Sequence, residues 1–183
     1  NKYSLDSDQQ NTWFVAPQAE IGKDSIDVFK AGYNTTKWIR ATVPGIVFND
    51  YVNAGIEKDP NFGGNIYKVD KKKYDRNFWY RTTFKTPTNY HNGQKLWLNF
   101  EGVNRKADVY FNGNYLGKLD GFMDRGKFDI SHLLDNSKEN VLAVLVYWPQ
   151  TPIPNYASPT YISSASWCCM AYVPGLLIGI TVN

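Results

Sequence analysis

Two neighbouring stretches with apolar side chains at every second position set the strongest limit on the fold. Residues 96–100 and 109–111 both follow this alternation, which is typical of strands that bury one face and expose the other. Asn112-Gly113 follows the second stretch, and both residue types tolerate the positive φ that a type I′ hairpin turn requires. Half-buried strands of this kind favour an antiparallel sandwich over a parallel α/β sheet, whose strands are apolar on both faces.

The rest of the chain predicts short strands and very little helix. We expect further strands near Ile26–Phe29, at 78–84 and at 141–146, the last being the most apolar and therefore central in its sheet. A short helix is predicted after Pro44 and before Gly55, and a loop at 59–65. The six residues predicted to share one core between two sheets are Leu98, Phe100, Val109, Phe111, Leu142 and Val144. At 183 residues we expect an all-β, single-domain jelly-roll β-sandwich with one or two short helices.

Composition argues against several classes of function. The net charge is only +3, and the run Lys71-Lys72-Lys73 is interpreted as a solvated loop, so no nucleic-acid partner is expected. We find no apolar run of the ~20 residues that a membrane helix needs, and no membrane span is predicted. The two cysteines, Cys168 and Cys169, are adjacent and have no recognised metal-ligand spacing with the histidines, so no metal and no cofactor is predicted.

Several motifs, in their order and spacing, resemble the amino-terminal domain of glycoside hydrolase family two. They are Val43-Pro44-Gly45 before the short helix, residues 59–65, Phe78-Trp79-Tyr80-Arg81, residues 102–104, residues 107–113 with Leu116-Gly117, residues 128–130 and residues 141–144. The resemblance runs from about Trp38 to the end of the chain, so we divide the single domain 1–183 into an entry segment, 1–37, and a family-like core, 38–183. The long Asp-Pro loop resembles the β-mannosidase and exo-glucosaminidase types more than the β-galactosidase type.

The resemblance implies a galactose-binding-like jelly roll at the start of a multidomain, retaining exo-glycosidase. An immunoglobulin-like sandwich and a (β/α)-barrel with the two catalytic glutamates would follow it, and both are absent from this chain. The four glutamates here include no Asn-Glu pair of the kind that carries the family's acid/base. The chain alone is therefore predicted to be non-catalytic, with the other domains of its parent as partners.

The tail, residues 161–183, carries the candidate site residues. Residues 166–175 resemble the family's Trp-Asp-Trp-Met-Pro-Tyr-Val-Pro-Gly segment, which lends an Asp and an aromatic side chain to the sugar pocket. Four positions are the candidate substrate-binding residues: Trp167, Cys168, Cys169 and Tyr172. Cys168 stands at the Asp position, and a thiol cannot give a sugar hydroxyl the charge-assisted hydrogen bond of a carboxylate. Core packing of a terminal strand is the alternative role for Trp167 and Tyr172.

Two other functions stay open at this point. A free-standing carbohydrate-binding module would need an exposed aromatic platform, for which the candidates are Trp13, Trp38, Trp148, Tyr156 and Tyr161. A structural interaction domain without a sugar site would instead expose a large apolar patch. The family resemblance and a chain that opens at Asn1 without Met lead us to expect a processed protein that is periplasmic or secreted, with a cytoplasmic location left open.

Overall fold

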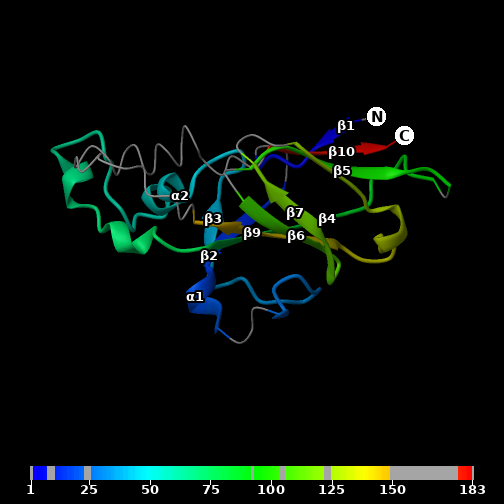
Figure 1. The fold of residues 1–183 in the computed structure, drawn as a ribbon, viewed down its shortest axis with the longest axis horizontal. Coiled ribbons are helices and arrows are strands. Elements are labelled where there is room, and N and C mark those ends of the chain that lie inside the picture. Colours follow the sequence, from blue (N-terminus) through cyan, green and yellow to red (C-terminus); the bar gives the residue numbers. More distant parts are fainter. Residues whose placement is uncertain are drawn as a thin grey trace.

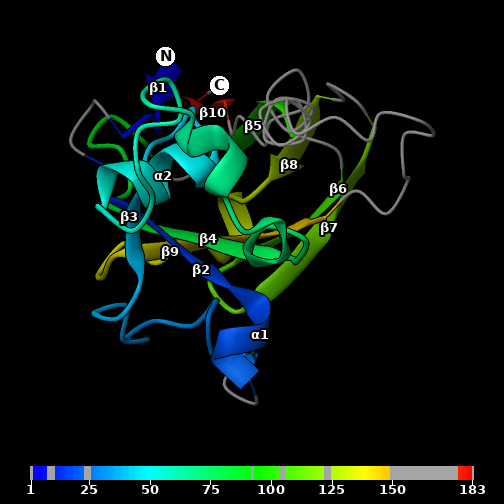
Figure 2. The ribbon, with the colours of Figure 1, turned by 90° about the vertical axis from the view of Figure 1, so that its left-hand side faces the viewer.

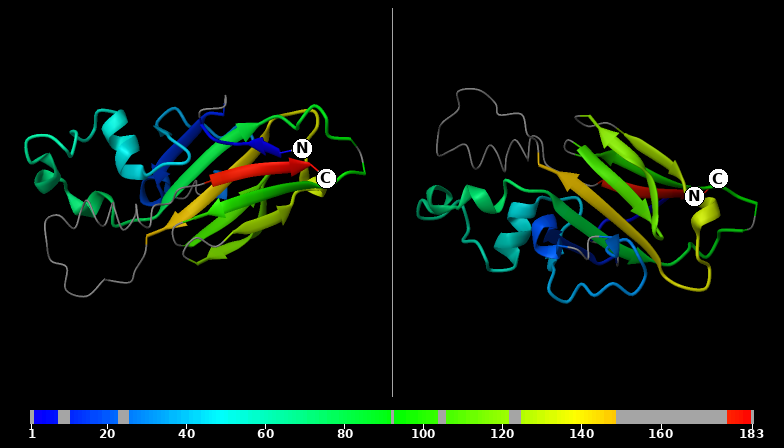
Figure 3. Two further views of the ribbon diagram at one scale, coloured as in Figure 1. Left: turned by 90° about the horizontal axis from the view of Figure 1, so that it is seen from above. Right: turned by 60° about the horizontal axis from the view of Figure 1, so that its bottom comes forward.

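Two antiparallel sheets stack face to face (Figure 1). The computed structural model describes residues 2–7, 11–22, 26–91, 93–103, 106–121, 125–148 and 177–182. The four-stranded sheet has the order β1 (Lys2–Ser4), β10 (Leu177–Val182), β5 (Leu96–Gly102), β8 (Gly126–Asp129). The six-stranded sheet has the order β3 (Ile39–Ala41), β2 (Trp13–Pro17), β4 (Phe78–Phe84), β9 (Asn140–Tyr147), β6 (Lys106–Phe111), β7 (Asn114–Asp120). Because β1 pairs with β10, the two ends of the chain lie side by side (Figure 3).

The main core fills the space between the sheets. All six residues predicted to share it are buried in one cluster: Leu98, Phe100, Val109, Phe111, Leu142 and Val144. The alternation in β5 and β6 therefore determined which side chains face inward, as expected for a sandwich. Strand β9 pairs with β4 on one side and β6 on the other, so its predicted central position is confirmed.

The helices are short and lie outside the sheets. Helix α1 (Gln18–Ile21) follows β2, and α2 (Val47–Asn53) begins three residues after Pro44, where a helix was predicted. Single 3₁₀ turns occur at Asn65–Lys68, Lys71–Lys73 and Ser131–Leu133. Figure 2 shows α1 on the outer side of the six-stranded sheet and α2 on the side of the four-stranded sheet. No helix in the described part of the chain is long and apolar enough to cross a membrane.

The predicted strand at Ile26–Phe29 is wrong. This segment is a turn that lies on the outer face of the six-stranded sheet, and Val28 is fully buried against that face. Its carbonyl oxygen accepts a hydrogen bond from Nε of Arg81, at 2.9 Å, instead of pairing in a sheet. Val28 and Phe29 thus pack in a second, smaller cluster with Trp79, Ala143 and Leu145, whereas Ile26 is exposed.

The predicted type I′ hairpin joins β6 and β7. Asn112 and Gly113 have φ of 46° and 84°, which confirms the positive φ at both central positions. The Asn112 side chain also ties the turn to its surroundings, since Oδ1 accepts the N–H of Val141 at 2.7 Å and Nδ2 donates to the carbonyl of Leu133 at 2.7 Å. The turn is therefore held by tertiary contacts as well as by its own backbone preference.

We expect Gly113→Ala to lower the free energy of unfolding by about 1–2 kcal/mol, because a Cβ is strained in the left-handed region. Gly113→Asn should cost less, since asparagine tolerates this conformation. Urea denaturation of both variants checks this. Equal losses for the two would show that the added side chain, and not the backbone conformation, causes the destabilisation.

Candidate functional site

The four predicted sugar-contacting residues, Trp167, Cys168, Cys169 and Tyr172, lie outside the residues that the structure describes. They belong to the connection between β9 and β10, and these two strands belong to different sheets. The connection therefore runs from the six-stranded to the four-stranded sheet. The role of the four residues stays a prediction.

The point where β9 ends is fixed against the start of β4. The backbone N–H of Trp148 donates to Oδ1 of Asn77 at 3.0 Å, directly after the last residue of β9. The same Asn77 side chain donates through Nδ2 to Gln18 at 2.8 Å. The chain thus leaves β9 beside residue 77, which ends the long segment between α2 and β4.

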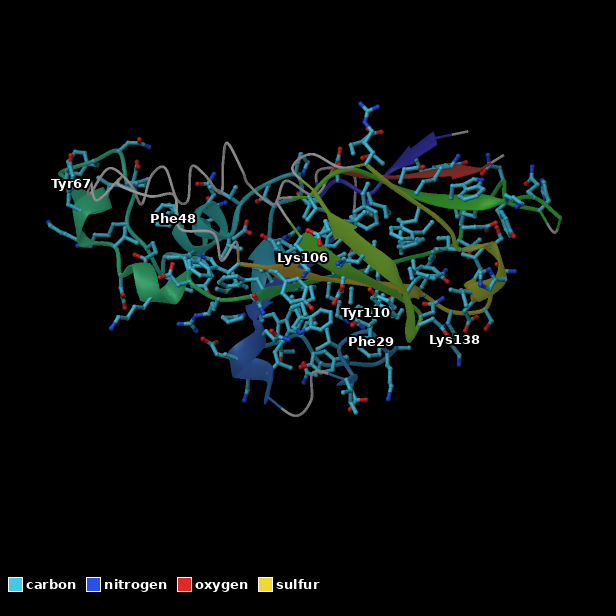
Figure 4. The ribbon with its side chains drawn as sticks, in the orientation of Figure 1. Phe29, Phe48, Tyr67, Lys106, Tyr110 and Lys138 are labelled. Atoms are coloured by element: carbon cyan, nitrogen blue, oxygen red, sulfur yellow. The ribbon has the colours of Figure 1, made fainter. Side chains whose placement is uncertain are left out.

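That segment, residues 54–77, projects from one end of the sandwich, and we call it the projecting segment. Figure 4 shows Tyr67 at its far tip, away from both sheets. Tyr67, Phe62 and Ile56 have exposed fractions of 60%, 75% and 50%. Exposed apolar side chains gathered on one segment are typical of a surface that contacts another protein or domain.

The projecting segment has local interactions that define its shape. Asp59 Oδ1 accepts the N–H of Asn61 at 2.8 Å, and Nδ2 of Asn65 donates to the carbonyl of Asp59 at 3.0 Å. At the base of the segment, Oε1 of Glu57 accepts hydrogen bonds from Lys73 at 2.8 Å and from the Tyr74 hydroxyl at 3.1 Å. Burial, reinforced by this carboxylate, raises the pKa of Tyr74, which keeps its hydroxyl protonated as a donor.

Asp50 in α2 is a buried carboxyl that the sequence did not single out. It is fully buried, and Oδ1 accepts the N–H of Thr42 at 2.8 Å. Burial raises its pKa from 3.8 to about 7, although the hydrogen bonds from Thr42 oppose the rise. Gly45 lies close by, and a Cβ at this position would come within 2.3 Å of the Thr42 carbonyl oxygen. Asp50 and Gly45 thus fix how the Val43-Pro44-Gly45 turn enters α2.

The aromatic residues considered for an exposed platform differ in their exposure to solvent. Trp13 is fully buried, and its Nε1 donates to the Leu5 carbonyl at 2.7 Å, so the expectation that it could be an exposed platform is wrong. Trp148 is 37% exposed, and Trp38 is half-buried beside Tyr33. Tyr156 and Tyr161 lie outside the described residues.

In the part of the chain that the structure describes, the His, Asp and Glu side chains form no group of three or more that could hold a metal ion. Two buried charged residues, Asp50 and Arg81, are engaged with backbone groups of the domain itself. Their interactions are structural.

The fold defines the class of this protein as a galactose-binding-like β-sandwich, and the comparisons agree with it. A family model described as "Glycosyl hydrolase 2 galactose-binding domain-like" matches residues 28–159. The chain belongs to this family of glycosyl hydrolase 2 domains.

Curated relatives and solved structures point to the same family. The chain is 33% identical to mannosylglycoprotein endo-beta-mannosidase of Lilium longiflorum over 149 residues, which cover 76% of the chain and 15% of the relative. It is 34% identical to beta-mannosidase of Rattus norvegicus, over 55% of the chain and 11% of the relative. In fold it is similar to the exo-chitosanase of Amycolatopsis orientalis, with a TM-score of 0.71, 24% identity, and coverage of 82% of the chain and 17% of the enzyme. The chain therefore spans only a small part of the proteins it matches.

Proposed function

We propose that this chain is the non-catalytic, amino-terminal domain of a longer glycosidase of the glycosyl hydrolase 2 family. The observation that carries the proposal is the family match over residues 28–159, together with relatives of which this domain makes up 15% and 11%. Those relatives are named as β-mannosidases, so the proposed parent is a hydrolase of β-linked sugars. It would use two carboxyl groups of another domain in a retaining mechanism.

The projecting segment supports a scaffold role. Ile56, Phe62 and Tyr67 are exposed on a loop with defined local hydrogen bonds, and the chain leaves β9 at the base of the same segment. Covering these side chains with the rest of the parent would remove apolar surface from water. The same contact would bring the connection between β9 and β10 next to the parent's other domains.

This connection would then supply one wall of the sugar pocket. Trp167 and Tyr172 are the residues proposed to stack on the apolar face of a sugar ring. Cys168 would line the pocket without the charged hydrogen bond that a carboxylate gives, so recognition of a hydroxyl at that point would be weak.

The chain alone is expected to release no nitrophenol from nitrophenyl β-mannoside, β-glucosaminide or β-galactoside, because the catalytic carboxyl groups of the proposed parent lie in another domain. The assay uses the purified chain, with an active glycosidase of the family as the positive control. Turnover that disappears on changing a single Asp or Glu of this chain would overturn the proposal.

A further inference from the structure

A groove lies on the outer face of the six-stranded sheet. It lies between α1 and the turn that follows it, on the side of the sheet shown at the bottom of Figure 2. Its volume is about 720 Å³, within the range of roughly 300–1,000 Å³ that is typical of small-molecule sites. We call it the Tyr33–Trp38 groove, and the lining residues that matter here are Ile21, Asp27, Lys30, Tyr33, Asn34 and Trp38.

Two aromatic rings give the groove a rigid apolar surface. The rings of Tyr33 and Trp38 meet edge to face, with their centroids 5.8 Å apart and an interplanar angle of 70°. Both side chains are half-buried and pack on the outer cluster that contains Val28 and Trp79. A sugar ring presents an apolar face of C–H groups, and an aromatic ring that is already held in place can stack on it at low entropic cost.

Two other partly exposed aromatic rings, Trp97 and Tyr147, each have a lysine ammonium group over them. The ring of Trp97 on β5 has the ammonium groups of Lys127 and Lys95 over it, at 4.4 and 5.4 Å from its centroid. The Lys106 ammonium group lies 5.4 Å from the ring centroid of Tyr147. Figure 4 labels Lys106 on the six-stranded sheet. These cation–π contacts compete with any ligand for the ring face, so the groove is a better candidate for stacking than either of these two rings.

Polar groups for sugar hydroxyls lie at the edge of the groove. The Lys30 ammonium donates to Asp27 Oδ1 at 2.8 Å, and both side chains are about half exposed. An ion pair this exposed contributes little to stability, so either partner can turn to a ligand at small cost. Sugar hydroxyls both donate and accept hydrogen bonds, and the carboxylate and the ammonium match these two functions. Asn34 adds an exposed amide at the same edge.

The backbone of the groove is held in position by the sheet beneath it. The buried Arg81 of β4 donates through Nε to the Val28 carbonyl at 2.9 Å and through Nη2 to the Lys30 carbonyl at 3.1 Å. The N–H of Gly113, in the β6–β7 hairpin, donates to the Phe29 carbonyl at 2.9 Å. Three hydrogen bonds thus fix residues 28–30. A loop that is already ordered loses less conformational entropy when a ligand binds.

We propose that the Tyr33–Trp38 groove is a saccharide-binding site that works independently of the tail. One pyranose ring stacks on Tyr33 or Trp38, and its hydroxyls bond to Asp27 and Lys30. Such a site goes beyond the proposed function, because it would hold a sugar chain on the outer face of the domain and needs no other domain to complete it.

Titration of the ¹⁵N-labelled 183-residue chain with β-1,4-mannobiose, and separately with the β-1,4 dimer of glucosamine, tests the proposal. We expect saturable NMR shifts in residues 27–38 and in the Trp38 indole N–H for at least one of the two sugars. The dissociation constant should be about 1 mM, the strength of a shallow site with few contacts. Tyr33→Ala should weaken binding about tenfold, and Trp148→Ala, which truncates an exposed aromatic outside the groove, should leave it unchanged.

Two further variants separate binding from folding. Asp27→Asn changes an exposed side chain at the rim and should weaken binding severalfold, while the spectrum of the free protein shows an intact fold. Tyr33→Phe keeps the ring and should keep most of the affinity. The proposal is overturned by an absence of saturable shifts with both sugars, by shifts centred on residues 166–175, or by affinity that Tyr33→Ala leaves unchanged. Loss of binding in the full-length parent would also overturn it, since the groove would then be a contact between domains.

Discussion

Phe111→Ala is expected to lower the free energy of unfolding by about 3–5 kcal/mol, enough to threaten folding of a domain whose stability is ~5–15 kcal/mol. Phe111 is fully buried between the two sheets, and its ring centroid lies 5.9 Å from that of Phe84. The truncation would remove apolar contacts with both sheets and leave a cavity that the strands, held by their ladders, cannot close.

Urea denaturation followed by tryptophan fluorescence measures this loss. Phe62→Ala is the matched control, because it makes the same change at a side chain that is 75% exposed, and it should alter stability by no more than about 0.5 kcal/mol. Phe111→Leu keeps most of the volume and provides a folded variant if the alanine variant does not fold. A loss below ~1 kcal/mol for Phe111→Ala would contradict the inward register of β6.

Asp50 is expected to make the folded domain less stable as the pH rises. Its pKa is raised from 3.8 to about 7 by burial, so the folded state holds this proton more tightly than the unfolded state does. The contribution of Asp50 to stability is therefore greatest below about pH 4 and is lost as the pH rises to about 7. A pKa difference of this size corresponds to about 4 kcal/mol.

The variant Asp50→Asn removes the titration and keeps an oxygen that can accept the N–H of Thr42. Relative to the wild-type chain, the variant should gain stability as the pH rises: the difference in free energy of unfolding should increase in its favour by up to about 4 kcal/mol between about pH 4 and about pH 8. Asp59→Asn makes the same change at an exposed carboxyl and controls for the loss of one negative charge. Urea denaturation at several pH values distinguishes the three proteins. Parallel curves for wild type and Asp50→Asn would show that Asp50 is ionised in the fold.

The pattern of apolar residues determined much of the fold. Alternation in residues 96–100 and 109–111 identified the inward side chains, because a strand has a period of two and one face must be dry. Asn112-Gly113 identified the β6–β7 hairpin, since few residue pairs accept positive φ twice in succession. The short helix after Pro44 and the central position of β9 were also predictable from local composition.

Which strands pair was decided by the tertiary structure. Strands β5 and β6 are neighbours in sequence and carry the same alternation, yet they lie in opposite sheets. A period of two tells which side chains point inward, and both sheets of a sandwich share the same interior. The pattern is therefore identical for either arrangement, and only the packing of both sheets around one core distinguishes them.

The second layer of burial was likewise outside the reach of sequence reasoning. The strand predicted near Ile26–Phe29 is a turn, and its Val28 and Phe29 side chains pack against the outer face of a sheet. Arg81 and Asp50 had no distinguishing sequence signal, since a charged residue in a strand or helix is usually solvated. Their burial depends on backbone groups of Val28, Lys30 and Thr42 that come from other parts of the chain. The sequence by itself determined the central strands and the family, whereas the partners of these buried charges and the Tyr33–Trp38 groove exist only once the sheets are stacked.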